Sequence, residues 1–373
     1  MRIVLQRDNF LKHVKLVTLG TEKKDALLSH IRISAEGGTV TFEATDFDVA
    51  LRTREQADVQ KPGVAVLPGA ALQAILEAAY PQVPVTLTDE EPNLLPNQFV
   101  ISCGTTRHRL MGLAPADYPR LNQEMPKPTW AFPAQTFLAL SKRSSYCMAR
   151  EEGQVNLFGL FLIGTTDSLT AVATDGNRLA LAKLQASEED DVFAEPSEFG
   201  TPFQALVHRR GVSLVEKIFS HSSGMLRLAP MKTEMGFTDG TVELFARIID
   251  ESFPDYELVI PASCTAEVQC ETAALQKTLK QLKPPKDSEA SVHVKVEESQ
   301  MLLESTLAEA VLPCTKSTEI SVAFEINIRY LLETLAATKT SKITLKFLDA
   351  TSPLIIGGGD QSLAVVMPVV PYG

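Results

Sequence analysis

A short core that occurs twice, 129 positions apart, constrains this chain more than any other feature of its sequence. The stretch from Ser168 to Lys183 alternates apolar and polar residues on both sides of Asp175-Gly176, a dipeptide that supplies the positive φ of a tight hairpin turn. It predicts two paired strands. The same Ala-Thr-Asp core occurs with Ala44 in the place of Ala173. A separation of this length indicates a repeated domain rather than a repeated motif.

Three segments of the chain open alike, each with a short strand that runs into a helix. Phe10, Phe137 and Ala274 align in these openings, which gives steps of 127 and 137 residues. A second strand and helix follow in each segment, and apolar residues such as Leu72 and Leu76 recur there at helical spacing. The pattern therefore predicts six helices, two in each of three domains.

Between the helices lie alternating runs that are typical of antiparallel strands with one covered face. They place the chain in the α+β class, with sheet dominant. The first two domains end similarly, at Ala116–Leu121 (ADYPRL) and at Ser252–Val259 (SFPDYELV). We therefore expect an N-terminal domain over 1–125, a middle domain over 126–263 and a C-terminal domain over 264–373.

The composition narrows the class of protein. A chain of 373 residues with 45% hydrophobic and 22% charged residues can bury several cores and is typical of soluble globular proteins. It has no secretory signal and no apolar run of about 20 residues, so we expect a cytoplasmic protein without a membrane partner. The cysteines form no metal-binding or disulfide pattern, so neither a metal nor a cofactor is expected; they are Cys103, Cys147, Cys264, Cys270 and Cys314.

The repeated acids, Asp46 and Asp175, are the candidates for acid–base chemistry, and a hydrolase that uses both is one hypothesis. Each lies in its own predicted hairpin turn, where Asp is favoured for local hydrogen bonds, so turn chemistry is the stronger interpretation. No Gly-x-Ser-x-Gly, His-Glu-x-x-His or phosphate-loop motif occurs. We therefore expect no enzyme and no catalytic residues.

Cations gather on the predicted helices although the net charge is −11. This distribution indicates a basic surface that faces phosphates, but lysines also commonly solvate helix faces, and the two readings are about equal from periodicity alone. The helix expected after Pro68 has no cation and weakens the case. The candidate DNA-facing residues are Lys12, Lys15, Lys23, Lys24, Lys142, Arg143, Arg150, Arg209, Arg210, Lys217, Lys277 and Lys280.

Four motifs carry a family resemblance that covers the whole chain. They are ATDGNRLAL at 173–181, NLFGLFL at 156–162, FPDYELVIP at 253–261 and VVMPVV at 365–370. With them the chain resembles the bacterial DNA polymerase III β subunit, the sliding clamp. The resemblance implies three similar domains of the DNA clamp fold, each with two helices packed on antiparallel sheets, that form half of a ring. A head-to-tail homodimer would encircle duplex DNA without reading its sequence, with the basic helices inside.

The resemblance also implies what the protein does. It would be a non-enzymatic processivity factor that tethers a replicative DNA polymerase, is opened by an ATP-dependent clamp loader and works at the nucleoid. Other proteins with a clamp-binding linear motif would share its peptide pocket. The alternative is an adaptor of the same fold that binds peptides but does not encircle DNA.

By the resemblance, a peptide-binding pocket lies between the middle and last domains. Its residues would be Leu157, Thr174, Gly176, Asn177, Arg178, Leu179, Pro254, Val259, Tyr330, Val365, Val366, Met367 and Pro368. Apolar walls with a few polar groups suit peptide anchors, whereas the residues alone favour ordinary sheet cores.

The chain departs from the family pattern at Asn177, at Leu258 and after Pro368, where five further residues end the chain. These departures leave the peptide preference open. For the dimer interface, the resemblance pairs His108 and Leu110 of one subunit with Leu282 and Lys283 of the next.

Overall fold

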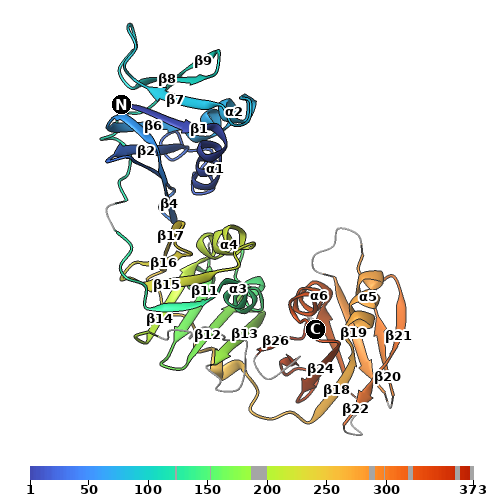
Figure 1. Cartoon of the computed structure of the whole chain (residues 1–373). Helices are drawn as coiled ribbons and strands as arrows, with labels where there is room; N and C mark the ends of the chain where they lie inside the picture. The colour runs from blue at the N-terminus through green and yellow to red at the C-terminus, as the bar shows by residue number, and fades with distance from the viewer. Residues whose placement is uncertain are drawn as a thin grey trace. The chain divides into compact units, whose positions relative to one another are not determined.

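The computed structural model describes residues 1–121, 124–151, 153–185, 200–284, 290–297, 299–317, 322–357 and 362–369. Lys286, which continues the cationic series of the fifth predicted helix, and the last four residues, 370–373, lie outside the described part. The chain forms two compact units: residues 1–135 with 213–248, and residues 136–212 with 249–373. Figure 1 traces the elements of each unit.

The first unit contains two antiparallel sheets. One has the order β5-β1-β7-β8-β9, and the other has the order β10-β15-β16-β17-β4-β3-β2-β6. The strands are β1 (Arg2–Gln6), β2 (His30–Glu36), β3 (Thr39–Thr45), β4 (Val49–Gln56), β5 (Asp58–Lys61), β6 (Gly63–Pro68), β7 (Pro84–Thr88), β8 (Gln98–Cys103), β9 (Thr106–Met111), β10 (Trp130–Pro133), β15 (Met225–Pro230), β16 (Glu234–Thr238) and β17 (Val242–Arg247).

The second unit contains the other two antiparallel sheets, of orders β14-β11-β12-β13-β26-β25-β24-β18-β22 and β21-β20-β19-β23. The strands are β11 (Gly159–Gly164), β12 (Ser168–Thr174), β13 (Arg178–Gln185), β14 (Phe203–His208), β18 (Ala266–Glu271), β19 (Ser291–Val296), β20 (Gln300–Glu304), β21 (Glu309–Pro313), β22 (Thr315–Lys316), β23 (Val322–Asn327), β24 (Lys342–Phe347), β25 (Leu354–Gly357) and β26 (Ser362–Val366).

The described residues form six α-helices, as the sequence periodicity predicts. Each of them follows directly on a strand, and each of the three predicted domains contains two. Phe10, Val14 and Val17 show the pattern: they recur at helical spacing and are fully buried on one face of the first helix. The helices are α1 (Arg7–Thr18), α2 (Gly69–Ala78), α3 (Ala134–Lys142), α4 (Arg209–Ile218), α5 (Thr272–Leu282) and α6 (Ile328–Ala337).

Two of the four sheets join strands from neighbouring predicted domains. β4 pairs with β17, with Leu51 opposite Leu244, and β13 pairs with β26, with Leu179 opposite Val365. Long apolar side chains from both sides of each junction are buried, so the cores continue across the junctions. The expectation of antiparallel sheets with two helices in each domain is confirmed, and no described helix has the length and apolar character needed to cross a bilayer.

Candidate functional site

An apolar cavity of about 170 Å³ opens in the second unit where four segments meet. These segments are the 3₁₀ turn Val155–Leu157, the β12–β13 hairpin, the residues that follow Phe253 and the end of β26. Its walls are almost entirely carbon, with a few hydroxyl, amide and guanidinium groups among them, which is the usual character of a ligand pocket. The lining residues are Leu157, Thr174, Gly176, Asn177, Arg178, Leu179, Pro254, Asp255, Tyr256, Val259, Val365 and Met367.

Strand pairing brings together walls that are far apart in the sequence. Arg178 lies opposite Val366 and Leu179 opposite Val365 on β26. Beyond the strand, the amide of Met367 donates to the carbonyl of Asn177 over 2.9 Å. Met367 is therefore held directly against the hairpin turn.

The turn itself is fixed by local hydrogen bonds. Oδ1 of Asp175 accepts from the amides of Asn177 and Arg178 at 3.1 and 3.2 Å, and Oγ1 of Thr174 accepts from Gly176. Gly176 has a φ of +87°, a conformation that favours glycine. The carboxylate of Asp175 therefore holds the turn, as the turn chemistry of Asp predicts.

A packed aromatic pair holds the third wall. Phe253 stacks on Phe161 of β11, with ring centroids 4.8 Å apart, and this fixes the start of the segment that carries Pro254 to Val259. Two of the apolar lining side chains stay partly in solvent, Val259 at 46% and Met367 at 39% exposure, and Leu258, next to Val259 in the chain, is 81% exposed. Exposed apolar groups gathered around one opening are typical of a binding surface.

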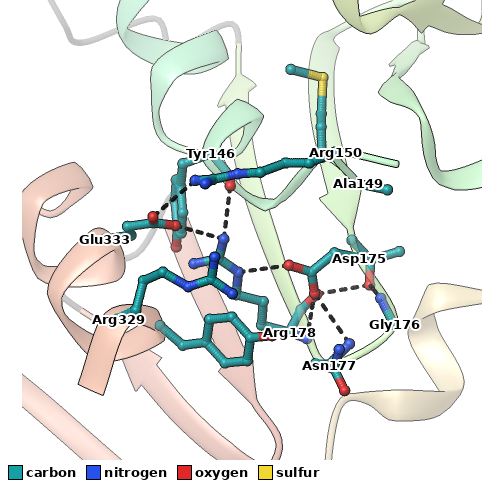
Figure 2. Close-up of polar contacts among 12 residues, drawn as sticks. Tyr146, Ala149, Arg150, Asp175, Gly176, Asn177, Arg178, Arg329 and Glu333 are labelled. Atoms are coloured by element: carbon teal, nitrogen blue, oxygen red, sulfur yellow. Dashed lines mark hydrogen bonds and ion pairs between the residues drawn. The ribbon is translucent and has the colours of Figure 1, made fainter. Parts of the chain in front are cut away.

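Arg178 lies behind the cavity in a network that reaches α6 (Figure 2). Its side chain is 2% exposed. Nε donates to Asp175 over 3.0 Å, and Nη2 donates to the carbonyl of Tyr146 and lies 2.6 Å from Glu333. The guanidinium carbon is 5.4 Å from the ring centroid of Tyr146 and 4.5 Å from that of Tyr330, distances that suit cation–π contact.

The electrostatics of this network keep Arg178 charged and keep Tyr146 and Cys147 neutral. Burial works against the charge of Arg178, but the acidic groups that face it, among them Asp175 and Glu333, raise its pKa overall. Burial also raises the pKa of Tyr146 well above its ordinary value and that of Cys147 to about 12. Within the described residues, the buried Nη1 of Arg178 has no hydrogen-bond partner. Nη1 is thus a buried donor that no described protein group satisfies.

The cavity collects ten of the thirteen residues that the resemblance implies for the pocket. Of the other three, Tyr330 lies against the guanidinium of Arg178, Val366 is fully buried, and Pro368 lies beyond the lining. Sequence reasoning missed Asp255 and Tyr256 as walls. Both belong to the FPDY motif, so the signal was present in the motif used for the resemblance.

The candidate DNA-facing cations are on or beside α1, α3, α4 and α5, and their environments differ. Nζ of Lys15 pairs with Glu77 at 2.8 Å, Arg150 pairs with Glu333 at 2.9 Å, and Arg209 donates to two backbone carbonyls. Arg143 and Arg210 are half-buried; the exposed members without an ion pair in the described residues are Lys12, Lys23, Lys24, Lys142, Lys217, Lys277 and Lys280.

Asp46 repeats the geometry of Asp175, because its Oδ1 accepts from the amides of Asp48 and Val49 at 3.1 and 2.9 Å. It lies in the first unit and Asp175 in the second. Each carboxylate is engaged by its own turn, which is the outcome that turn chemistry predicts. Among the described residues, no group of His, Cys, Asp and Glu is arranged to hold a metal ion.

All four sheets are open in the described part of the chain, and β9 and β21 are two of their edge strands. Antiparallel residues point their backbone groups alternately toward and away from the neighbouring strand. The amide of Gly112 donates to Asn97, so the backbone groups of Arg107 and Arg109 point away from β8. By the same alternation, the bond from Ser305 to Ala308 directs those of Val311 away from β20.

His108 and Leu110, the first half of the expected dimer interface, lie half-buried on β9. Leu282 ends α5 with only 2% exposure, and Lys283 follows it. α5 contacts β21, so this second half lies beside an open edge.

Family models of the DNA polymerase III beta subunit match this chain in order: the N-terminal domain at residues 1–122, the central domain at 131–255 and the C-terminal domain at 257–370. A beta sliding clamp of Pseudomonas putida is 25% identical over 99% of this chain and all of its own length. One of Caulobacter vibrioides is 26% identical over 95% of each chain.

Solved structures show the same fold. The polymerase III beta of Caulobacter crescentus superposes with a TM-score of 0.89 at 24% identity, over 99% of this chain and all of that one. The DNA polymerase III subunit beta of Pseudomonas aeruginosa gives a TM-score of 0.88 at 22% identity, with the same coverage. A sliding clamp of Bartonella birtlesii bound to griselimycin gives 0.87 at 24%, over 99% of each chain. Because the three domain models account for nearly the whole chain in their proper order, the chain belongs to the DNA polymerase III beta subunit family, the beta sliding clamps.

Proposed function

We propose that this chain is a DNA sliding clamp that encircles duplex DNA as a head-to-tail homodimer and tethers a replicative polymerase. As a member of its family it is a processivity factor without catalytic activity of its own. The observation that carries the proposal is the presence of all three family domains, in order, in one chain. We keep 1–125, 126–263 and 264–373 as the domain limits, which the limits of the family models support.

The two open edges support the head-to-tail closure. Arg107 and Arg109 give β9 positive charge, whereas Glu304 and Glu309 give the neighbourhood of β21 negative charge. Outward backbone groups on both strands can form a new antiparallel ladder, and opposite charges fix which edge meets which. His108, Leu110, Leu282 and Lys283 would lie at this contact.

The apolar cavity supports the tethering role. Its volume and carbon walls suit one or two hydrophobic side chains of a linear peptide, and the free Nη1 of Arg178 can bind a peptide carbonyl. We assign it to the polymerase, the ATP-dependent clamp loader and other proteins with such a motif. The solvent-exposed Leu258 would add an apolar contact at the rim.

The cationic helix residues would hold DNA through weak contacts to phosphates, which are blind to sequence and sensitive to salt. The ion pairs of Lys15 and Arg150 with glutamates offset part of this charge, and Arg209 is held by backbone carbonyls, so retention would depend mainly on the exposed lysines. A protein with this role acts on the chromosome, and we place it in the cytoplasm at the nucleoid.

The test combines mass and topology. Light scattering should give twice 40.7 kDa, and loaded protein should stay on circular DNA but leave linearised DNA. Replacing Lys24, Arg143, Arg210 and Lys280 with Glu should abolish retention. The matched control replaces Lys61, Lys232, Lys295 and Lys342, which lie outside the helices, and changes the net charge equally. Equal retention of both variants would favour the adaptor that does not encircle DNA.

A further inference from the structure

Cys270 on β18 lies close enough to Cys314, the residue between β21 and β22, for the two thiols to interact electrostatically. The β18–β22 register places Val268 opposite Lys316 and Gln269 opposite Thr315, and its continuation by one step past the end of β22 sets Cys270 opposite Cys314. The 43 residues between them in the sequence include β19, β20 and β21. The fold therefore brings the two cysteines together, and their spacing in the sequence does not predict it.

Hydrogen bonding defines which kind of cross-strand pair this is. The amide of Ser317 donates to Glu267, so the odd-numbered residues of β18 direct their backbone groups toward β22. The amide of Thr272 donates to Ser341, so the even-numbered residues face β24 instead. Cys270 thus belongs to a non-hydrogen-bonded pair with Cys314. Such pairs bring Cα atoms to about 4.5 Å, within the range that a disulfide spans.

The side chains share one environment. Residues directly opposite on paired strands project to the same face of the sheet, and here both thiols are free and buried, at 5% and 8% exposure. Burial raises the pKa of Cys270 to about 12, with Cys314 contributing, and burial also raises the pKa of Cys314. The thiols therefore stay protonated at neutral pH, and their oxidation is slow unless the strand end opens.

We propose that Cys270 and Cys314 form a redox-sensitive clip, a reversible disulfide between β18 and the residue before β22 that hydrogen peroxide closes. When the strand end opens, one thiol loses its proton and the thiolate attacks a peroxide oxygen. The O–O bond breaks, a sulfenic acid forms, and the leaving hydroxide takes up the proton as water. The second thiol then displaces the sulfenic oxygen, forming the S–S bond and releasing a second water. Two thiols lose two electrons in total, and the peroxide gains them.

The position of the clip determines what it can affect. Cys314 is the first residue after Pro313, which ends the open edge strand β21, and its amide donates to Ser299 beside β20. A covalent link at this point fixes the end of β21 relative to the nine-stranded sheet. Since the proposed subunit contact uses β21, oxidation would slow the opening of the ring; this consequence rests on the proposed function, whereas the clip itself does not.

The chemical test uses the full-length protein and hydrogen peroxide. After oxidation, remaining thiols are alkylated and the digest is mapped by mass spectrometry. We expect a linked pair of peptides that contain Cys270 and Cys314, lighter by two hydrogen atoms and separated by a thiol reductant. Cys147, buried with its pKa raised to about 12, and the more accessible Cys264 serve as internal controls. Recovery of Cys270 and Cys314 only as alkylated thiols or sulfinic acids would overturn the proposal.

A structural readout needs no dimer. Hydrogen exchange at the amides of Thr315 and Ser317, which face β18, should slow at least tenfold on oxidation and recover on reduction, and Cys314→Ser should abolish the response. Cys264→Ser should keep it. Unchanged exchange in a protein that carries the link would refute the clip as a constraint on this strand. The rate of subunit exchange is then compared between the oxidised and reduced protein, and oxidation should slow it. A protein that carries the disulfide but is monomeric in both redox states would contradict the proposed ring and leave the clip itself intact.

Discussion

The ion pair between Arg178 and Glu333 should hold α6 to the β12–β13 hairpin, and a double-mutant cycle can measure this. Arg178→Met keeps most of the volume between Tyr146 and Tyr330, but it leaves Asp175 without its counter-charge and Glu333 with the exposed Arg150 as its partner. The two carboxylates are 18% and 27% exposed, so they are only partly hydrated. Breaking a buried pair on one side costs about 3 kcal/mol at the lower end of its usual range, and we expect that value here.

Glu333→Gln alone should cost about 2 kcal/mol, because the amide keeps the contact and loses the charge. In the background of Arg178→Met the same change should cost almost nothing, so the coupling energy is about 2 kcal/mol. The assay is hydrogen exchange at the most protected amides of α6, converted to free energies of opening.

Arg150 supplies the matched control. It contacts the other oxygen of Glu333 at 2.9 Å, but its side chain is 56% exposed. Solvent screens such a pair, so the cycle between Arg150→Met and Glu333→Gln should give less than about 0.5 kcal/mol. A coupling for Arg178 as small as that for Arg150 would refute the reasoning, since it would mean that stacking between the two tyrosines holds the residue without its charge.

Three further predictions concern the backbone, pH and the open edge. Phe47 is 66% exposed and has a φ of +71°, a backbone conformation that is strained for a residue with a side chain. In thermal unfolding, Phe47→Gly should therefore stabilise the first unit by about 1 kcal/mol, whereas Gly176→Ala should destabilise the second. A destabilising Phe47→Gly would show that the backbone at Phe47 is not strained. Burial raises the pKa of Tyr118 from 10.0 to about 12, so its contribution to stability is complete below pH 10 and is lost as pH rises toward 12; Tyr118→Phe should flatten this decline in urea unfolding. Val311→Pro removes an amide that points away from β20 and leaves the hydrogen bonds to β20 in place, so it should disrupt only the pairing between subunits. Light scattering should show a folded monomer for Val311→Pro and a dimer for Val311→Ala. A dimeric proline variant would show that β21 is not part of the interface.

Local patterns in the sequence predicted the elements because each depends on neighbouring residues. The hairpin around Asp175-Gly176 forms as the dipeptide predicts, and helices appear wherever apolar residues recur at three- and four-residue spacing. Another Asp-Gly turn, at Asp239-Gly240, was not predicted. Its aspartate accepts from the amides two and three residues further on, as Asp175 does. A search for the turn chemistry alone would have found it.

The pairings between distant strands could not be predicted, since their registers depend on contacts made only in the folded chain. The local sequence around Arg178 does not predict that its charge pairs with Glu333, 155 positions later. It also does not predict that Val366 lies opposite Arg178 on β26. The resemblance supplied most of the pocket because it carries information from other folded chains. It left out Asp255 and Tyr256, which lie on a segment positioned by the packing of Phe253 rather than by strand register.

Arg178 links recognition in the cavity to the junction of the middle and C-terminal domains. Its side chain lines the cavity, yet its other contacts reach Glu333 and Tyr330 on α6. A peptide carbonyl that binds Nη1 would add a partner to a guanidinium whose remaining contacts span both domains, so binding and domain attachment share one residue. A ligand that stabilises this arrangement must then protect α6 from hydrogen exchange as well as the cavity walls. This reciprocal effect follows from linkage and does not require any change of shape.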